Sequence, residues 1–135
     1  MASEPLRFGP HTLRREADIL VLRMNGPFTL ADATQFYVFV EQVHTEHGRC
    51  FLLADVAALG NIEMEARRYV ARRAEGHIEA VAAYGANPVI RTVAELLFSA
   101  IRLMRKRTTA QLAFVKDEAE GRRWLAERRA HAGEP

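Results

Sequence analysis

The sequence contains one cysteine, Cys50, and only two serines, Ser3 and Ser99. A single cysteine excludes an internal disulfide framework and a zinc site built from several cysteines. We find no glycine-rich phosphate loop and no serine-histidine-aspartate arrangement. No apolar run approaches the roughly 18 residues of a membrane span, and the first residues lack the basic-then-apolar order of a secretion signal. From these absences we expect a cytoplasmic protein without an integral membrane segment.

Charge is distributed unevenly along a chain that is otherwise typical of a soluble globular domain, with 49% hydrophobic and 27% charged residues. Residues 1–63 carry 5 arginines against 8 acidic residues, and residues 64–135 carry 14 basic against 9 acidic residues. The basic half would suit an acidic partner, although solvated helix faces are the simpler interpretation. The basic clusters at 67–73 and 102–107 contain a single aromatic residue, Tyr69, too few for a series of stacking platforms, so we expect no nucleic-acid partner.

Hydrophobic periodicity predicts an alternation of strands and helices. Strands are expected at residues 11–16, 18–24, 50–56, 78–84 and 110–115, and helices from Thr29 to about His47, from Ile62 to Glu75, from Asn87 onward and from Asp117 onward. This order predicts a single α/β domain over residues 1–135 with a five-stranded mixed sheet, the last three strands mutually parallel, and about four helices largely on one face. The core is expected over about residues 10–129, with unanchored ends.

Each predicted helix start carries a residue suited to capping. Thr29 and Asp32 form a short capping box, and Asp117 has Glu120 at the matching position. Asn87 is a good N-cap, and Pro88 after it fits the first helical position. The remaining N-cap candidate is Asn61.

Carboxylates follow the central strand, where an α/β domain often receives an anion. Glu63 and Glu65 lie in the first turn of the predicted helix, where each stabilises the positive end of the helix dipole by about 0.3 to 1 kcal/mol. A second interpretation is a fixed negative charge where a related protein carries a reversible phosphate. Under either interpretation, a free phosphate ligand is disfavoured here.

Three stretches carry a resemblance to a known family: "LLADVAALG" (52–60), "AAYGANPVIRTVAELLF" (82–98) and "AFVKDEAEGRRWLAE" (113–127). Together with the element order, they resemble the STAS domain of bacterial anti-sigma-factor antagonists, in its SpoIIAA-like (STAS/SEC14-like) branch. The resemblance covers roughly residues 10–129 and implies a STAS-like fold. It also implies a regulatory, protein-binding role rather than catalysis, and no cofactor.

The chain departs from the family pattern after the central strand. Regulatory STAS antagonists have an Asp-Ser-Ser-Gly-like turn there, whose serine is phosphorylated, whereas this chain has "GNIEMEARR" (60–68) without any serine. The phosphorylation switch therefore does not carry over. We expect a protein partner to dock on the surface formed by Asp55, Asn61, Glu63, Glu65, Arg67 and Arg68. The alternative is a SEC14-like carrier of a lipid or small apolar ligand, with a pocket between the helix after Asn87 and the sheet.

Other candidate residues have plainer explanations. Cys50 opens a predicted buried strand and is expected to be an inert packing residue. His44 and His47 share a helix face with Glu41, but histidines at a helix end also suit its dipole, so we expect no metal site. The apolar helix after Asn87 could bury its second face in a homodimer or around a lipid tail.

Overall fold

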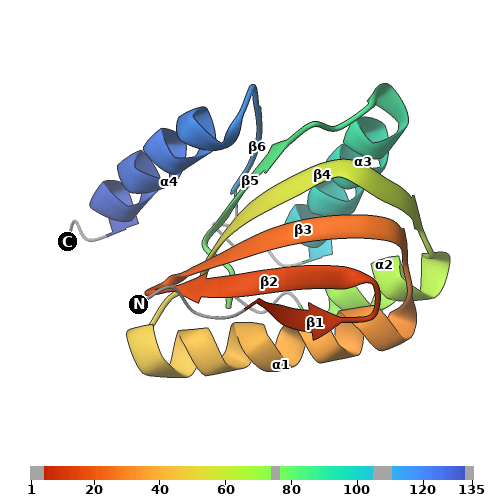
Figure 1. The fold of residues 1–135 in the computed structure, drawn as a ribbon, viewed down its shortest axis with the longest axis horizontal. Coiled ribbons are helices and arrows are strands. Elements are labelled where there is room, and N and C mark those ends of the chain that lie inside the picture. The colour runs from red at the N-terminus through yellow and green to blue at the C-terminus, as the bar shows by residue number, and fades with distance from the viewer. Residues whose placement is uncertain (1–4, 74–76, 105–110, 133–135) are drawn as a thin grey trace.

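The computed structural model describes residues 5–73, 77–104 and 111–132 and contains one mixed sheet with helices on both faces (Figure 1). Within these residues there are six strands and four helices. In chain order they are β1 (Leu6–Phe8), β2 (His11–Glu16), β3 (Ile19–Phe28), α1 (Leu30–His47), β4 (Phe51–Ile62), α2 (Met64–Arg73), β5 (Ala80–Tyr84), α3 (Pro88–Met104), β6 (Gln111–Val115) and α4 (Glu118–Ala132).

The strands lie in the sheet in the same order as in the sequence. The pairs β1–β2 and β2–β3 are antiparallel, and β3, β4, β5 and β6 are joined by parallel pairs. The predicted mixed sheet and its three parallel strands are confirmed, but the sheet has six strands rather than five. The extra strand, β1, falls where an unanchored end was predicted, and its Phe8 is fully buried. Three residues are too few to show a period of two, so no strand signal is visible in the sequence there.

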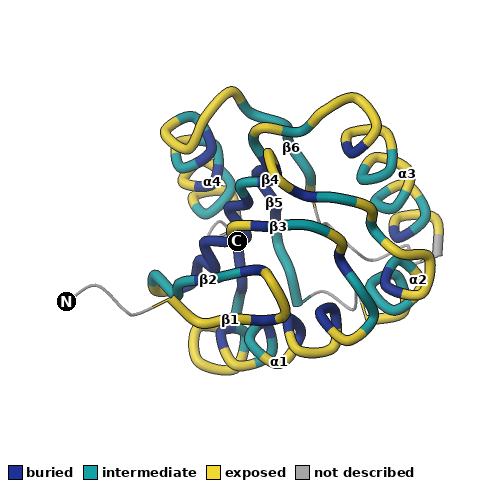
Figure 2. The backbone as a smooth tube through the Cα atoms, turned by 45° about the vertical axis from the view of Figure 1, so that its right-hand side comes forward, coloured by how far each residue is buried: buried dark blue, intermediate teal, exposed yellow. Residues whose placement is uncertain are grey.

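Three helices cover one face of the sheet, and α4 covers part of the other (Figures 1 and 2). The crossovers from β3 to β6 all advance in one direction across the sheet, and because parallel crossovers are almost always right-handed, α1, α2 and α3 lie on the same face. Their larger core includes Tyr37, Val40 and Ile90. The smaller core joins Leu125 of α4 to side chains of the sheet: Ile19, Val21, Phe51, Leu53, Ala80 and Ala82.

Three of the four predicted helix caps are present. The Thr29 hydroxyl accepts from the Asp32 amide at 3.2 Å, and the Asp32 carboxylate accepts from the Thr29 amide at 3.1 Å. The Asn87 side chain accepts from the amide three residues on, at 2.9 Å. The Asp117 side chain accepts in the same way at 2.9 Å, and Glu120 reaches back to the preceding backbone. These helices therefore begin where local chemistry places them.

The fourth predicted cap, Asn61, is wrong because the central strand does not break at Gly60. Strand β4 continues to Ile62 beside β3, and Glu63 is the last residue before α2, accepting the Arg67 amide through its own carbonyl. A Cβ on Gly60 would lie 3.0 Å from the backbone of Gly26. The glycine therefore permits close approach of two irregularly paired strands, rather than marking a turn.

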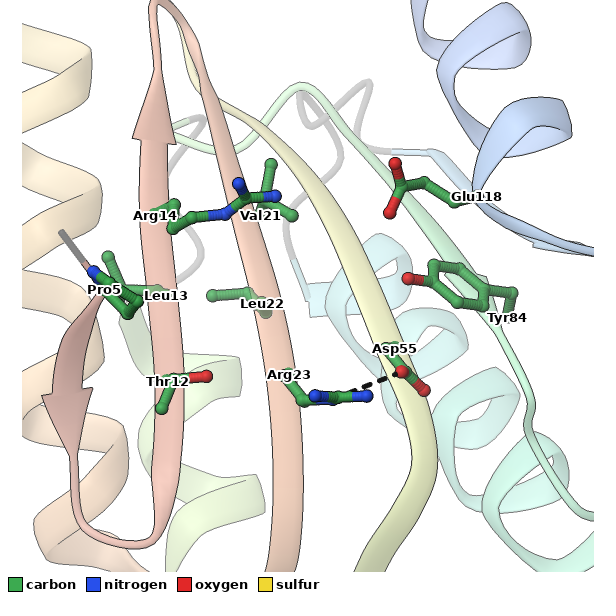
Figure 3. Close-up of a pocket in the computed structure, with 10 residues that line it drawn as sticks. All are labelled: Pro5, Thr12, Leu13, Arg14, Val21, Leu22, Arg23, Asp55, Tyr84 and Glu118. Atoms are coloured by element: carbon green, nitrogen blue, oxygen red, sulfur yellow. Dashed lines mark ion pairs between the residues drawn. The ribbon is translucent and has the colours of Figure 1, made fainter. Parts of the chain in front are cut away.

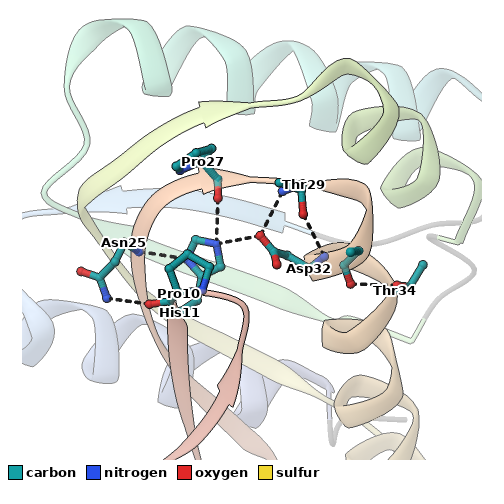
Figure 4. A network of polar contacts seen from close by, with 8 residues as sticks. Pro10, His11, Asn25, Pro27, Thr29, Asp32 and Thr34 are labelled. Atoms are coloured by element: carbon teal, nitrogen blue, oxygen red, sulfur yellow. Dashed lines mark hydrogen bonds and ion pairs between the residues drawn. The ribbon is translucent and has the colours of Figure 1, made fainter.

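A buried polar network fixes the β2–β3 hairpin to the start of α1 (Figure 4). The Asn25 amide donates to Nδ1 of His11 at 2.9 Å, so the ring proton lies on Nε2. That nitrogen donates towards the Pro27 carbonyl at 3.1 Å and the Asp32 carboxylate at 3.2 Å. His11 is thus a structural side chain that satisfies buried polar groups.

A second polar cluster docks the end of α4 onto the sheet. The buried Asp18 accepts hydrogen bonds from Arg49, at 2.8 Å, and from Arg129 of α4. Burial by itself would raise the pKa of Asp18, but the two arginines together hold it below its ordinary value. The Arg129 guanidinium also lies over the Phe51 ring.

Candidate functional site

The second half of β4 projects beyond its neighbour β5. The β4–β5 pairing ends at Asp55 and Tyr84, whereas pairing with β3 continues to Phe28 and Ile62. Residues 56–62, here called the β4 overhang, therefore have β3 on one side and no strand from the described part of the chain on the other. Unpaired backbone N–H and C=O groups on such an edge are able to bind another strand.

The free edge of the overhang begins after Ala57. Gly85 directly follows β5, and a Cβ on it would lie 2.9 Å from Cβ of Ala57. The chain that leaves β5 therefore passes directly against Ala57. Beyond it, Ala58 and Asn61 are exposed. Two polar groups of the segment are already paired: the Ala57 amide donates to Asp55 at 3.1 Å, and the Ile62 carbonyl accepts from Arg67 at 2.8 Å.

The start of α2 closes the overhang with charged and apolar side chains. Glu63, Glu65 and Arg68 are exposed, and Met64 between the two glutamates is 54% exposed. Ala66 is fully buried and anchors this turn of the helix. The two carboxylates lie where the helix dipole favours negative charge.

The structure separates Asp55 from the other predicted site residues. Asp55 follows Phe51 and Leu53 on the face of the sheet that α4 covers, and it precedes Glu63 by eight residues of mostly extended chain. At about 3.3 Å per residue, eight extended residues span up to about 26 Å. Asn61, Glu63, Glu65, Arg67 and Arg68 lie together at the far end of the overhang.

Asp55 instead lines a hollow on the sheet face that α4 leaves open (Figure 3). This sheet groove has a volume of about 400 Å³, and a second hollow of about 390 Å³ shares Thr12, Arg23 and Asp55 with it. Tyr84 and Glu118 project from the α4 side towards the arginines of β2 and β3 in Figure 3. The sheet groove is lined by Pro5, Thr12, Leu13, Arg14, Val21, Leu22, Arg23, Asp55, Tyr84 and Glu118.

Arg122 of α4 holds Glu118 at 3.1 Å and Glu16 at 2.9 Å, whereas the two arginines of the groove pair only loosely with carboxylates. Nε of Arg23 lies 3.7 Å from the Asp55 carboxylate, and Nη2 of Arg14 lies 3.9 Å from Glu16. Both distances exceed that of a direct hydrogen bond. Burial raises the pKa of Tyr84, and the nearby Asp55 and Glu118 carboxylates add to the effect, so this phenol remains a neutral hydrogen-bond donor.

Of the residues that line this groove only Asp55 was predicted, and the titratable residues missed are Arg14, Arg23, Tyr84 and Glu118. The available signal was strand alternation, since Arg23 shares a face with the apolar Ile19 and Val21. An arginine within such a series indicates that the apolar cover ends there. The groove also needs α4 to stop short of β2, which no local pattern in the sequence specifies.

Other predicted features have structural roles. Cys50 is fully buried, as predicted, and burial raises its pKa to about 12, so the thiol is neutral, which supports the interpretation of a packing residue. The His44 ring lies against the His77 ring with centroids 4.8 Å apart. In the described residues no three metal-binding side chains come together. Arg73 pairs with Glu41 and lies over Tyr37 and Tyr69, whereas residues 105–107 of the other basic cluster lie outside the described part.

Within the described ranges, no helix is long and apolar enough to span a membrane. No protein-family model and no curated protein matches the sequence. Among solved structures, one similar chain is an uncharacterized protein of the DUF3478 family from Shewanella loihica PV-4, described as having a SpoIIAA-like fold. The two share 18% sequence identity with a TM-score of 0.55, over 84% of this chain and 89% of that one. The protein therefore has a SpoIIAA-like fold, the fold of the STAS domain that its sequence resembles.

Proposed function

We propose that this protein is a non-enzymatic binding module that captures a protein partner through residues 55–68. The observation that carries the proposal is the β4 overhang, an exposed strand edge next to a charged helix start. The partner contributes an extended segment that pairs with the free edge, as in other cases of strand addition. Residues 55–68 of this chain contain no serine, threonine or tyrosine, so phosphorylation of a hydroxyl side chain on this surface does not control the contact.

The backbone edge supplies affinity, and the side chains around it supply selectivity. Main-chain hydrogen bonds recognise any extended peptide, so discrimination between partners needs flanking groups. Met64 offers an exposed apolar anchor between Glu63 and Glu65. The carboxylates favour a partner segment with basic residues next to an apolar one.

The groove extends the same docking surface on the face below the overhang. Arg23 and Asp55 stand where the overhang begins, and their 3.7 Å separation leaves donor and acceptor positions for a partner's side chains. A charged segment that continues past the overhang would therefore meet complementary groups at both ends. In this proposal Asp55 therefore belongs to the same interface as Glu63 despite the distance between them.

The geometry favours this role over catalysis and over lipid carriage. The buried Cys50 thiol is neutral, which removes the cysteine as a nucleophile. In the carrier alternative, an apolar ligand lies between α3 and the sheet, but Ile90 and Ile101 are buried there and Phe98 packs against the core. The two described hollows lie instead on the sheet side that α4 only partly covers, among charged residues.

The test is photo-crosslinking in cells of the source organism. A photoreactive amino acid at Asn61 should trap one discrete partner, because this exposed side chain stands on the overhang. The same group at Thr34, an exposed position on α1, is the matched control and should trap none. Trapping of the same protein from both positions, or from Thr34 alone, would contradict the proposal.

Charge reversal then tests the flanking residues. Glu63→Lys and Glu65→Lys should each weaken recovery of the crosslinked partner severalfold, and the double variant should weaken it further. Glu127→Lys on α4 makes the same change in charge at a side chain that is 66% exposed and should leave recovery unchanged. If all three single variants behave alike, the effect is one of net charge rather than of site.

A further inference from the structure

The outer face of α3 carries a stripe of apolar side chains that the described part of the fold does not cover. Val89, Leu96 and Leu103 are 70%, 66% and 80% exposed, and they recur every seven residues. Seven residues make about two helical turns, so the three side chains form one line along the helix. We infer that this α3 stripe is a homodimer interface, in which α3 packs antiparallel against α3 of a second copy.

Small side chains between the large ones make the stripe self-complementary. Thr92 and Ser99 lie on the same exposed face as Leu96 and Leu103. With the two-fold axis between Leu96 and Ser99, each Leu96 rests on the partner's Ser99 and each Leu103 on the partner's Thr92. Large side chains then pack against small ones along the contact, as knobs into holes require.

The polar atoms within the stripe are compatible with burial. The Thr92 hydroxyl donates to the Pro88 carbonyl of its own helix at 2.9 Å. The Ser99 hydroxyl accepts from Arg102 at 3.4 Å. Covering these hydroxyls therefore leaves neither without a hydrogen bond, which is the condition for a low-cost polar group in an interface.

Charges beside the stripe select an antiparallel second copy. Glu95 and Arg102 precede Leu96 and Leu103 and border the stripe on one side. Neither forms an ion pair with another described residue, and seven residues, about 10 Å along the axis, separate them within one helix. In the antiparallel arrangement Glu95 faces the partner's Arg102, and the symmetry repeats this pair. A parallel arrangement gives neither residue an opposite charge.

The interface is at the small end of the range for stable dimers. A helix of 17 residues is about 25 Å long, so one helix pair covers less than the roughly 800 Å² per partner of a standard interface. We therefore expect dimerisation at micromolar rather than nanomolar protein concentration. The stripe lies on the α3 side of the sheet and leaves the β4 overhang to the binding partner.

Sedimentation velocity of the purified chain over a micromolar to millimolar range tests the dimer. The wild type should pass from monomer to dimer, and Leu96→Glu should remain monomeric at all concentrations while keeping its thermal midpoint, because Leu96 is largely exposed. Val38→Glu alters an apolar residue of α1 that is 53% exposed and should dimerise like the wild type. A wild type that stays monomeric, with or without a co-purified lipid, or equal effects of the two variants, would overturn the inference.

A charge swap tests the orientation. Glu95→Arg and Arg102→Glu should each weaken dimerisation at least tenfold, and the double variant should restore most of the loss, because each reversed charge meets its reversed partner in the other copy. The pair is too far apart within one helix for intrachain rescue. Restoration that fails while both single variants dissociate would overturn the antiparallel geometry.

Discussion

Replacing Leu125 by alanine should weaken the packing of α4 against the sheet. Leu125 is the one fully buried side chain that α4 contributes to the smaller core, and Trp124 beside it is partly buried. Buried leucine-to-alanine changes cost about 2.7 to 5 kcal/mol, depending on how far the cavity collapses. The strand β5 beneath Leu125 is paired on both sides and cannot move up to fill the space. We therefore expect a cost of about 4 kcal/mol.

The thermal consequence follows from chain length. An unfolding entropy of about 2.1 cal/mol/K per residue gives about 0.28 kcal/mol/K for 135 residues, so 4 kcal/mol lowers the midpoint by about 14 °C. Leu103→Ala makes the same chemical change at a side chain that is 80% exposed and should stay within about 0.5 kcal/mol of the wild type in dilute solution.

The assay is urea unfolding followed by tryptophan fluorescence and far-ultraviolet circular dichroism. The single tryptophan, Trp124, lies on α4 and reports on its docking, whereas circular dichroism reports on the whole domain. A loss below about 1 kcal/mol for Leu125→Ala would refute the account of a second core on this face. A fluorescence transition that precedes the circular dichroism transition would show α4 leaving before the rest unfolds.

Three further predictions concern chemistry and cargo. The Cys50 thiol should react with a disulfide reagent in native protein no faster than the domain unfolds, since its pKa is raised to about 12 and it is fully buried; rapid labelling near pH 8 would contradict this. Asp18→Asn should cost about 2 to 3 kcal/mol at neutral pH. Because the folded-state pKa of Asp18 is lowered, its contribution to the free energy of unfolding is present above the unfolded-state pKa of about 3.9 and is lost as pH falls below it. The stability difference between Asp18→Asn and the wild type should therefore shrink below pH 4, and a larger difference there would contradict this argument. Native mass spectrometry of freshly purified protein should show no bound lipid, and a stoichiometric lipid would favour the carrier alternative.

Local sequence signals predicted the helices that begin with a side chain capping their own first turn. Thr29, Asn87 and Asp117 each cap a helix through a side chain that contacts the next turn, and a short window of sequence contains that information. The alternation of strands and helices likewise predicted the parallel half of the sheet, because right-handed crossovers leave few topologies.

The features that the sequence did not predict depend on residues far apart in the chain. Residues 57–61 look like a turn because Gly60 interrupts an apolar run, yet β3 holds them in a strand through a pairing that spans more than thirty residues. Similarly, the short β1 is a strand only because β2 is beside it. Asp55 and Glu63 are near in sequence but far apart in space, because an extended strand joins them. The residues predicted as one site therefore lie in two places, with Asp55 in the groove and the others at the far end of the overhang.

The central claim, that a partner strand pairs with the β4 overhang, is tested most directly by amide hydrogen exchange. The measurement compares the chain alone with its complex with the partner trapped at Asn61. The account predicts that exchange slows within residues 56–62 on binding, because free backbone amides acquire hydrogen bonds. Protection confined to α1 or α3, with unchanged exchange along residues 56–62, would contradict it.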